Sequence, residues 1–547
     1  MSRRASNALL LAGCLIALFW NLGSHGLTEP DEGRTAGIGL EFFQSGTWLV
    51  PRLYDLAQFN KPPLVYWACS LAYRICGVNE WAARLPAALA ALGTLLLTRS
   101  IARRLYGERE AIAATLILLT APMFFTMAHI IDPNMMLTFW ITFSMWAAIA
   151  WFQDGKKFQQ WIFYLALGIA FLAKGPPAFG VVGLALLGHR YLPGRDRKLW
   201  RSMVNIPALL IAIAIALSWF VAVSMKHPEL WDFFLGRELV GRFASNVHGR
   251  TQPPWFFLPL LPGGFLPWLP LFFVALFAAV KSFKTDQRAR LLVLWVVLPF
   301  IMFSLSKSKL PGYILPLFPP CAILMGAEAI RQSQARWFRM LQIPIAIVAP
   351  AVACAAFARY GTHEFGWATA FAQRDAIWLL PLAGAAIAAV FLKPEKKVIA
   401  ASVFAVLSYF CCLQLVARHD HQLEAHSSMR RLAGVLKPML QTGDRVVILK
   451  CAPRGVDFYL NWPLSFSDKY EVQIQSDWQR LAGRIYKDGE VAIPYGWFDV
   501  EPRVFVITTD RVRGSENDSP LDFLAKACRK KPREVYRDGK YVVVANF

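Results

Sequence analysis

Long apolar stretches separated by short polar loops occupy most of this 547-residue chain. Runs close to the roughly 20 residues that span a bilayer as a helix recur from residue 8 to residue 417. The first run, Ala8 to Leu22, follows Arg3 and Arg4 without a small-residue cleavage site after it. It predicts an uncleaved anchor with its N-terminus inside. Further spans are expected near residues 85–104, 110–127, 133–152, 160–173, 177–190, 204–224, 256–280, 290–305, 313–330, 340–358, 377–392 and 398–417.

Basic residues predict the orientation of these spans, because Lys and Arg gather at the cytoplasmic ends of short loops. One outward and one return span fit between successive basic clusters. About thirteen spans result, an odd number that puts the C-terminus outside. The clusters expected in the cytoplasm are Arg99/Arg103/Arg104/Arg109, Lys156/Lys157, Arg190/Arg195/Arg197/Lys198, Lys281/Lys284/Arg288/Arg290, Arg331/Arg336/Arg339 and Lys393/Lys396/Lys397.

Residues 28–84 lie between the first two spans and are expected outside the membrane core. The sequence predicts a helix from about Asp31 to Gln44. Pro62 to Val78 is apolar but interrupted by Arg74, and as a span it would invert every later basic cluster. We expect it along the outer interface as an amphipathic helix rich in aromatic residues.

Residues 420–547 differ from the rest because they contain more charge and no long apolar run. A helix-like stretch, Met429 to Leu440, precedes strand patterns at 444–450 and 503–509, and the chain ends in a predicted hairpin with an Asp538–Gly539 turn. The expected fold is therefore a polytopic α-helical membrane domain, residues 1–419, followed by an α/β domain outside the membrane, residues 420–547.

Composition supports a membrane protein. The chain is 56% hydrophobic and 17% charged, with a mean hydropathy of +0.39, more apolar than a soluble globule of this length. The net charge of +22 is partly explained by the cytoplasmic basic loops, and no nucleic-acid partner is expected. The nine cysteines contain no CxxC spacing that would predict a zinc site, and pairing of Cys451 with Cys528 stays open.

Acidic residues expected on the outer face are the first candidates for chemistry. Glu29, Asp31 and Glu32 stand together in TEPDEGR, and Asp132 lies in the short outer turn HIIDPN. The structural alternative is that Asp31 and Glu32 cap a helix after Pro30, and that Asp132 caps the helix after Pro133. The sequence leaves both interpretations open.

Outward loops also carry cations that the charge rule does not require. Such residues suit a phosphate-bearing lipid, through charge-assisted hydrogen bonds. An isolated interfacial lysine is more simply explained by snorkelling, and His248 by a solvated loop. The outward cations are Arg34, Arg52, Lys61, Arg84, Lys174, Arg237, Arg242, Arg250, Lys307 and Lys309, the last two close to Tyr313.

Several short motifs in order, between residues 28 and 320, resemble a known family. Together they resemble the aminoarabinose transferases of lipid A, within the GT-C superfamily of membrane glycosyltransferases. Protein O-mannosyltransferases and other polyprenyl-phosphate-sugar enzymes share parts of the pattern. The motifs are DEGR followed by SGTWLVP, then NKPPLVYW, the second outer-loop Asp, LAKGPP, GRF with a later His and Arg, and SKSKLPGYILPLFP.

The resemblance implies a GT-C fold and a specific reaction. The enzyme would move 4-amino-4-deoxy-L-arabinose from undecaprenyl phosphate to a phosphate of lipid A, with inversion at the anomeric carbon. It would lie in the bacterial inner membrane, in contact with membrane lipids, with its active site and C-terminal domain facing the periplasm. The product would confer resistance to polymyxin-type cationic peptides.

A glycosyl phosphate has a good leaving group, so cations that hold the departing phosphate can replace a strong acid. Lys61 is the first choice for the donor phosphate, with Arg34, Lys174, Arg242, Lys307, Lys309 and Tyr313 as further candidates. The expected catalytic carboxylates are Asp31, Glu32 and Asp132. Asp31 would act as a base towards a hydroxyl acceptor. Towards an ionised phosphate acceptor it would orient the acceptor, stabilise the cationic sugar centre or pair with the donor's ammonium. A divalent metal is left open, with Glu29 and His248 as weak candidate ligands.

Two other classes of function fit part of the pattern. A transporter or flippase for an anionic lipid would also have many spans and interfacial cations. However, the sequence shows no inverted repeat with matched broken helices and no carboxylate deep within a span, which proton-coupled carriers often have. A structural or receptor role is the third alternative.

Overall fold

The computed structural model divides the chain into two compact units, which are described separately. Unit 1 comprises Met1–Asn21, Ala87–Trp219 and Leu235–Leu415, and unit 2 comprises Leu22–Pro86, Phe220–Phe234 and Val416–Phe547. The residues that the structure describes are 3–54, 56–190, 204–236, 252–332, 428–449, 451, 453–466, 497–500, 502–510, 519–538 and 540–547.

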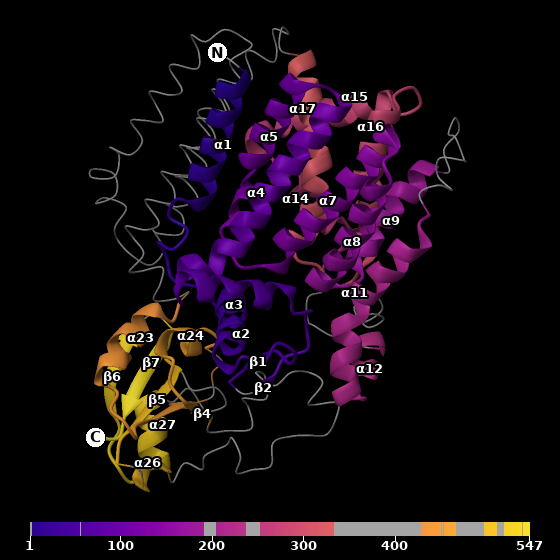
Figure 1. Cartoon of the computed structure of the whole chain (residues 1–547). Helices are drawn as coiled ribbons and strands as arrows, with labels where there is room; N and C mark the ends of the chain where they lie inside the picture. Colours follow the sequence, from indigo (N-terminus) through magenta and orange to yellow (C-terminus); the bar gives the residue numbers. More distant parts are fainter. Residues whose placement is uncertain are drawn as a thin grey trace, which may run out of the picture. The chain divides into compact units, whose positions relative to one another are not determined.

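Unit 1 is a bundle of helices (Figure 1). Within the described ranges, five helices are long and apolar enough to cross a membrane, or six if the bent pair α5 and α6 counts as one. Helices α4 and α11 each extend into unit 2 at one end. The helices are α1 (Arg3–Phe19), α4 (Glu80–Leu105), α5 (Glu108–Leu119), α6 (Pro122–Ala128), α7 (Pro133–Asp154), α8 (Lys157–Lys174), α9 (Pro177–Arg190), α11 (Ile206–Lys226), α14 (Phe257–Gly263), α15 (Leu269–Lys281), α16 (Gln287–Leu305) and α17 (Phe318–Arg331).

Two of the expected spans are broken rather than continuous. The run at 110–127 forms α5 and α6, whose axes differ by 68°. Pro122 begins α6 and has no N–H to continue the ladder of α5, so the backbone turns there. The run at 256–280 is broken after α14 at Gly263 and Gly264 and resumes as α15.

The spans expected near 340–358, 377–392 and 398–417 lie outside the described residues. The other expected spans, 85–104, 133–152, 160–173, 177–190, 204–224, 290–305 and 313–330, correspond to helical segments α4, α7, α8, α9, α11, α16 and the 3₁₀ turn η4 (Pro311–Leu317) with α17.

Unit 2 contains the segment that carries the acidic motif. Helix α2 (Asp31–Ser45) ends at Gly46, whose φ of +67° makes it a left-handed C-cap. A short antiparallel hairpin, β1 (Arg52–Leu53) with β2 (Leu56–Ala57), leads to α3 (Leu64–Cys76). The helices expected at 31–44 and within 62–78 are therefore confirmed.

The C-terminal part of unit 2 is an α/β fold around a mixed five-stranded sheet. Its strand order is β4-β3-β5-β7-β6, with β3 parallel to β4 and β5 and with β7 antiparallel to β5 and β6. The predicted C-terminal hairpin is confirmed as β6 and β7. The elements are α23 (Arg430–Leu436), β3 (Arg445–Ile448), α24 (Val456–Leu460), β4 (Leu464–Phe466), α26 (Trp497–Val500), β5 (Val504–Thr509), α27 (Pro520–Ala527), β6 (Arg533–Asp538) and β7 (Tyr541–Ala545).

Helices cover both faces of this sheet. Leu432 of α23 and Val456 of α24 pack on one face, and Phe498 of α26 and Leu524 of α27 pack on the other. All residues of β5 and β7 are buried, as expected for central strands with two covered faces. Cys451 and Cys528 are free thiols, so the disulfide left open by the sequence is not formed.

Helices α5 and α17 of unit 1 approach each other closely at Gly326. A Cβ built on Gly326 would lie 2.6 Å from the backbone nitrogen of Ala114 and 2.7 Å from the carbonyl oxygen of Glu110. Backbone atoms cannot rotate away as a flexible side chain does. Only glycine therefore permits this helix contact without a shift of the helices.

We expect Gly326→Ala to lower stability by about 1–3 kcal/mol through overpacking. Gly183→Ala on α9 is the matched control, because a Cβ at Gly183 meets nothing within 4 Å. The measurement is the thermal unfolding midpoint of both variants in one detergent. Equal midpoints for the two variants would contradict the close approach.

Candidate active site

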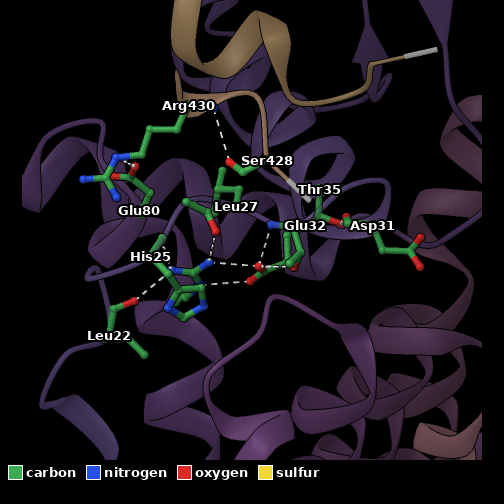
Figure 2. Close-up of polar contacts among 12 residues, drawn as sticks. Leu22, His25, Leu27, Asp31, Glu32, Thr35, Glu80, Ser428 and Arg430 are labelled. Carbon is green, nitrogen blue, oxygen red and sulfur yellow. Dashed lines mark hydrogen bonds and ion pairs between the residues drawn. The ribbon is translucent and has the colours of Figure 1, made fainter. Parts of the chain in front are cut away.

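Glu32, the second residue of α2, forms a buried ion pair with Arg84 of α4. Arg84 Nε donates to Glu32 Oε1 and Arg84 NH2 donates to Glu32 Oε2, both at 2.9 Å, and the two side chains are 4% or less exposed. The backbone N–H and hydroxyl of Thr28 also donate to Oε2. Both carboxylate oxygens therefore have hydrogen-bond partners, at the centre of the contacts in Figure 2.

Arg84 also binds the backbone that precedes α2. Its NH1 donates to the carbonyl oxygens of Leu22 and His25, at 3.0 and 2.8 Å, and its NH2 donates to that of Gly26 at 3.0 Å. With the two bonds to Glu32, all five N–H donors of the guanidinium are used. One buried side chain thus fixes both the first turn of α2 and the loop leading into it.

The environment of Glu32 keeps it ionised. Burial raises the pKa of Glu32, but the charge of Arg84 and the hydrogen bonds from Arg84 and Thr28 outweigh this effect and lower the pKa to about 2. A carboxylate with both oxygens occupied and 3% exposure cannot reach a substrate without breaking the pair. This geometry favours a structural role for Glu32 over the catalytic role expected from the sequence.

Asp31 differs from Glu32 although the two residues are adjacent. Its side chain is 51% exposed, and Oδ1 accepts a hydrogen bond from NH2 of Arg34, 13% exposed, at 2.6 Å. The residue at the N-cap of α2 is Pro30, which makes no side-chain capping bond, while Glu32 accepts from the Thr28 N–H ahead of the helix. Asp31 is therefore the exposed carboxylate of the motif.

Glu29, the weak metal candidate, is bound to the backbone of the C-terminal part of unit 2. Its Oε2 accepts from Arg454 N at 2.8 Å and its Oε1 from Gly455 N. Burial raises the pKa of Glu29 to about 7, against the effect of these two hydrogen bonds. Among the described residues, His, Cys, Asp and Glu form no group of three that could hold a metal ion, and His248 lies outside them.

Lys61 belongs to the same unit as Asp31. It is half-buried in the segment between β2 and α3, directly before Pro62 and Pro63. The two prolines fix the backbone where α3 begins. Lys61 is therefore carried by a short, restrained connection.

A second group of predicted site residues lies in unit 1, around Asn134. Asp132 accepts a hydrogen bond from Asn134 N at 2.6 Å and so caps α7, as its structural alternative predicted. The Nζ of Lys174 donates to Asn134 Oδ1 and lies 4.0 Å from the ring centroid of Tyr313. The structure thus brings Asp132, Lys174 and Tyr313 together through Asn134.

The remaining predicted cations differ in their surroundings. Lys309 is 3% exposed, and its Nζ donates to the carbonyl oxygens of Gln252, at 2.9 Å, and Ser306. These bonds support a role in holding the loop before η4. Lys307 is exposed nearby, and Arg242 lies outside the described residues.

Comparison with known proteins finds aminoarabinose transferases among the similar proteins. The structure matches ArnT from Cupriavidus metallidurans, solved bound to undecaprenyl phosphate, with a TM-score of 0.82 and 26% identity over 100% of this chain and 99% of that chain. An undecaprenyl phosphate-alpha-4-amino-4-deoxy-L-arabinose arabinosyl transferase of Pseudomonas fluorescens (strain Pf0-1) is 34% identical over 346 residues. Over most of its length the chain is similar to these aminoarabinose transferases. The resemblance inferred from the motifs is confirmed.

Further comparisons point to the same class of protein. A relative of the same name from Proteus mirabilis is 32% identical over 63% of each chain. The family model for dolichyl-phosphate-mannose-protein mannosyltransferase matches residues 60–223. The match to the Pseudomonas fluorescens relative covers 61% of this chain and 62% of that protein, less than two thirds of its length. The chain is a multi-pass membrane protein of the GT-C type.

Three residues that organise the site have no role predicted from the sequence. Arg84 appears there only among the outward cations, Asn134 only within a motif, and Arg454 in neither. The one signal for Arg84 is its position directly before the expected span 85–104. Arg84 and its partner Glu32 are 52 residues apart, and Gly455 and its partner Glu29 are 426 residues apart. Contacts between residues this distant in the sequence leave no local pattern that would reveal them.

We expect Glu32→Gln to lower stability by about 3–5 kcal/mol at pH 7, because it leaves the buried charge of Arg84 without its counter-ion. The folded-state pKa of about 2 lies below the ordinary value of 4.5. The stabilisation by ionised Glu32 is therefore complete above pH 4.5 and is lost as the pH falls towards 2. The unfolding midpoints of wild type and variant should converge over that range.

The control is Glu534→Gln, which removes an exposed pair with Arg537 on β6. Exposed pairs typically contribute about 0–1 kcal/mol, so a small effect is expected. The buried ion pair would be contradicted if Glu32→Gln lowered the unfolding midpoint no more than the control does. It would also be contradicted if the difference in midpoint between wild type and Glu32→Gln stayed unchanged down to pH 3.

Proposed function

We propose that the chain transfers 4-amino-4-deoxy-L-arabinose from undecaprenyl phosphate to a phosphate of lipid A. The observation that carries this proposal is the full-length structural match to ArnT bound to undecaprenyl phosphate. The names of the curated relatives support the same sugar donor. A less anionic lipid A and resistance to polymyxin-type peptides would follow.

The reaction needs little proton transfer. An oxygen of the acceptor phosphate forms a bond to the anomeric carbon of the sugar, while the bond from that carbon to undecaprenyl phosphate breaks. The bonding electrons leave with undecaprenyl phosphate, and the configuration inverts. An ionised phosphate has no proton to remove, so positioning and electrostatic stabilisation carry most of the rate.

Asp31 and Lys61 are the residues to which we assign the main roles in unit 2. Asp31 is accessible and ionisable, and it would orient the acceptor or bind the ammonium of the sugar. Lys61, on its proline-restrained segment, would stabilise the departing phosphate. Glu32 would act indirectly, by holding the first turn of α2.

For unit 1 we propose that Lys174 and Tyr313 contribute to binding the donor phosphate and that Asp132 assists through Asn134. The basis is the ordered contact of Lys174 with the Tyr313 ring. Lys307, Lys309 and Arg242 remain proposals from charge, although the buried bonds of Lys309 to carbonyl oxygens favour a structural role for it.

We also propose the topology. The chain would lie in the bacterial inner membrane with about thirteen spans, an estimate from the positive-inside rule. Residues 1–419 would form the membrane domain, with residues 28–84 on the periplasmic side, and residues 420–547 a periplasmic α/β domain.

A second candidate acceptor is a protein hydroxyl. The match of residues 60–223 to the protein mannosyltransferase model favours it. A hydroxyl must lose its proton as it attacks, so Asp31 would then act as a general base.

We expect aminoarabinose on lipid A when the chain is expressed in a Gram-negative strain that lacks its own transferase but makes the donor. Asp31→Asn and Lys61→Ala should abolish the adduct while leaving the protein folded in the membrane, because each removes one proposed group. The measurement is mass spectrometry of lipid A, with immunoblots of membranes. Absence of the adduct despite expression and donor would reject lipid A as acceptor, and normal transfer by Lys61→Ala would remove its phosphate-binding role.

The topology gives a separate prediction. A phosphatase fused after Phe547 should be active, because it folds only outside the cytoplasm, whereas a fusion after Lys157 should be inactive. An active fusion after Lys157 together with an inactive fusion after Phe547 would show the opposite orientation.

A further inference from the structure

The strand-rich part of unit 2 contacts the acidic motif through residues 453–455. Glu29 accepts hydrogen bonds from the backbone N–H groups of Arg454 and Gly455, and the hydroxyl of Tyr54 donates to the carbonyl oxygen of Pro453. Three successive residues are thus held by their backbone. The position of Arg454 is fixed beside α2 without using its side chain.

Gly33 of α2 allows this backbone to lie against the helix, and Gly37 lies at ordinary contact distance from it. A Cβ on Gly33 would lie 2.7 Å from Gly455 Cα, and a Cβ on Gly37 would lie 3.7 Å from the Arg454 carbonyl oxygen. Gly33 and Gly37 are four residues apart and share one helix face. Arg34 follows Gly33 directly, so Arg34 and Arg454 both start from this contact.

The charges at this contact do not balance. Arg34 pairs with one exposed carboxylate, that of Asp31, while its buried Nε has no hydrogen-bond partner among the residues that the structure describes. The pKa of Arg454 is lowered by burial and by the positive charge of Arg34, and raised in part by Asp31 and Glu29. The raised pKa of Glu29 leaves it partly neutral near pH 7. The two arginines are therefore accompanied by the exposed Asp31 carboxylate and a partly neutral Glu29.

We propose that Arg454 and Arg34 form a binding site for a phosphate monoester, the attacking phosphate of the acceptor lipid. This inference rests on the proposed transfer reaction. It assigns Arg34 to the acceptor, in place of the donor role expected from the sequence. Arg454 becomes a substrate-binding residue contributed by the C-terminal part of the chain.

Charge and geometry favour the acceptor over the donor. A phosphate monoester approaches two negative charges near neutral pH, because its second pKa is about 6. The donor phosphate is a diester and carries one negative charge. One guanidinium group can donate two parallel hydrogen bonds to phosphate oxygens, and two guanidinium groups match the two charges of a dianion. In a direct displacement the attacking and departing phosphates lie on opposite sides of the sugar, so each phosphate needs its own cations. Lys61 is proposed for the departing phosphate of the donor.

We expect Arg454→Ala to raise the KM for lipid A about 10-fold or more, the size expected for a lost charge-assisted hydrogen bond, and to leave the KM for the donor unchanged. Arg454→Lys should restore part of the affinity. The assay uses the purified full chain in nanodiscs with both lipid substrates. Binding of lipid A and of phosphatase-treated lipid A is measured in parallel by thermophoresis, without donor.

Two controls separate binding from folding. Arg529→Ala removes an exposed arginine that follows α27, and it should leave both KM values and lipid A binding unchanged. Tyr54→Phe removes a side-chain bond to Pro453 without changing charge, and it reports the effect of weaker docking alone. The unfolding midpoint is recorded for each variant.

The outcomes distinguish this site from the proposed reaction. Binding that depends on the lipid phosphate and on Arg454, without any transfer by wild type, supports the site and rejects the reaction. Transfer by wild type with unchanged acceptor KM and lipid A binding in Arg454→Ala overturns the site. A rise in the donor KM alone, or an effect reproduced in full by Tyr54→Phe, also overturns it.

Discussion

The buried ion pair between Glu32 and Arg84 is the interaction on which the candidate site depends. Burying two charges is costly unless their hydrogen-bonding capacity is filled, and here both carboxylate oxygens and all five guanidinium N–H groups have partners. Three of those partners are backbone carbonyls of the loop before α2. The pair therefore fixes the path of the backbone into the first turn of α2, where Asp31 and Arg34 lie.

Three neighbouring acidic residues consequently have three different environments. Glu29 binds backbone N–H groups 425 and 426 residues later in the chain, Asp31 is half-exposed beside Arg34, and Glu32 is buried against Arg84. Restraint on both sides of Asp31 holds it in place while leaving its carboxylate accessible. A loop with three exposed carboxylates would not give one of them a defined position, because like charges repel and long side chains have many rotamers.

Local patterns predicted the elements well and the contacts between them poorly. The helix expected from Asp31 to Gln44 is α2, Asp31–Ser45, and the C-terminal hairpin is β6 with β7. The bend at Pro122 lies within one apolar run, so hydropathy alone predicts a continuous span there. The sequence suggests a catalytic role for Glu32 because it shows an acidic residue but not its buried partner, Arg84. The resemblance of the motifs located the site region, and only the structure separated Asp31 from Glu32.

The chemistry of the proposed transfer explains why a carboxylate of the motif can have a structural role. A phosphate leaving group needs cations more than a proton donor, and an ionised phosphate nucleophile needs orientation more than a base. One accessible carboxylate at Asp31 is then sufficient. Its neighbours are free to bind Arg84 and the Arg454–Gly455 backbone, and these bonds give the site the fixed geometry from which electrostatic stabilisation derives its effect.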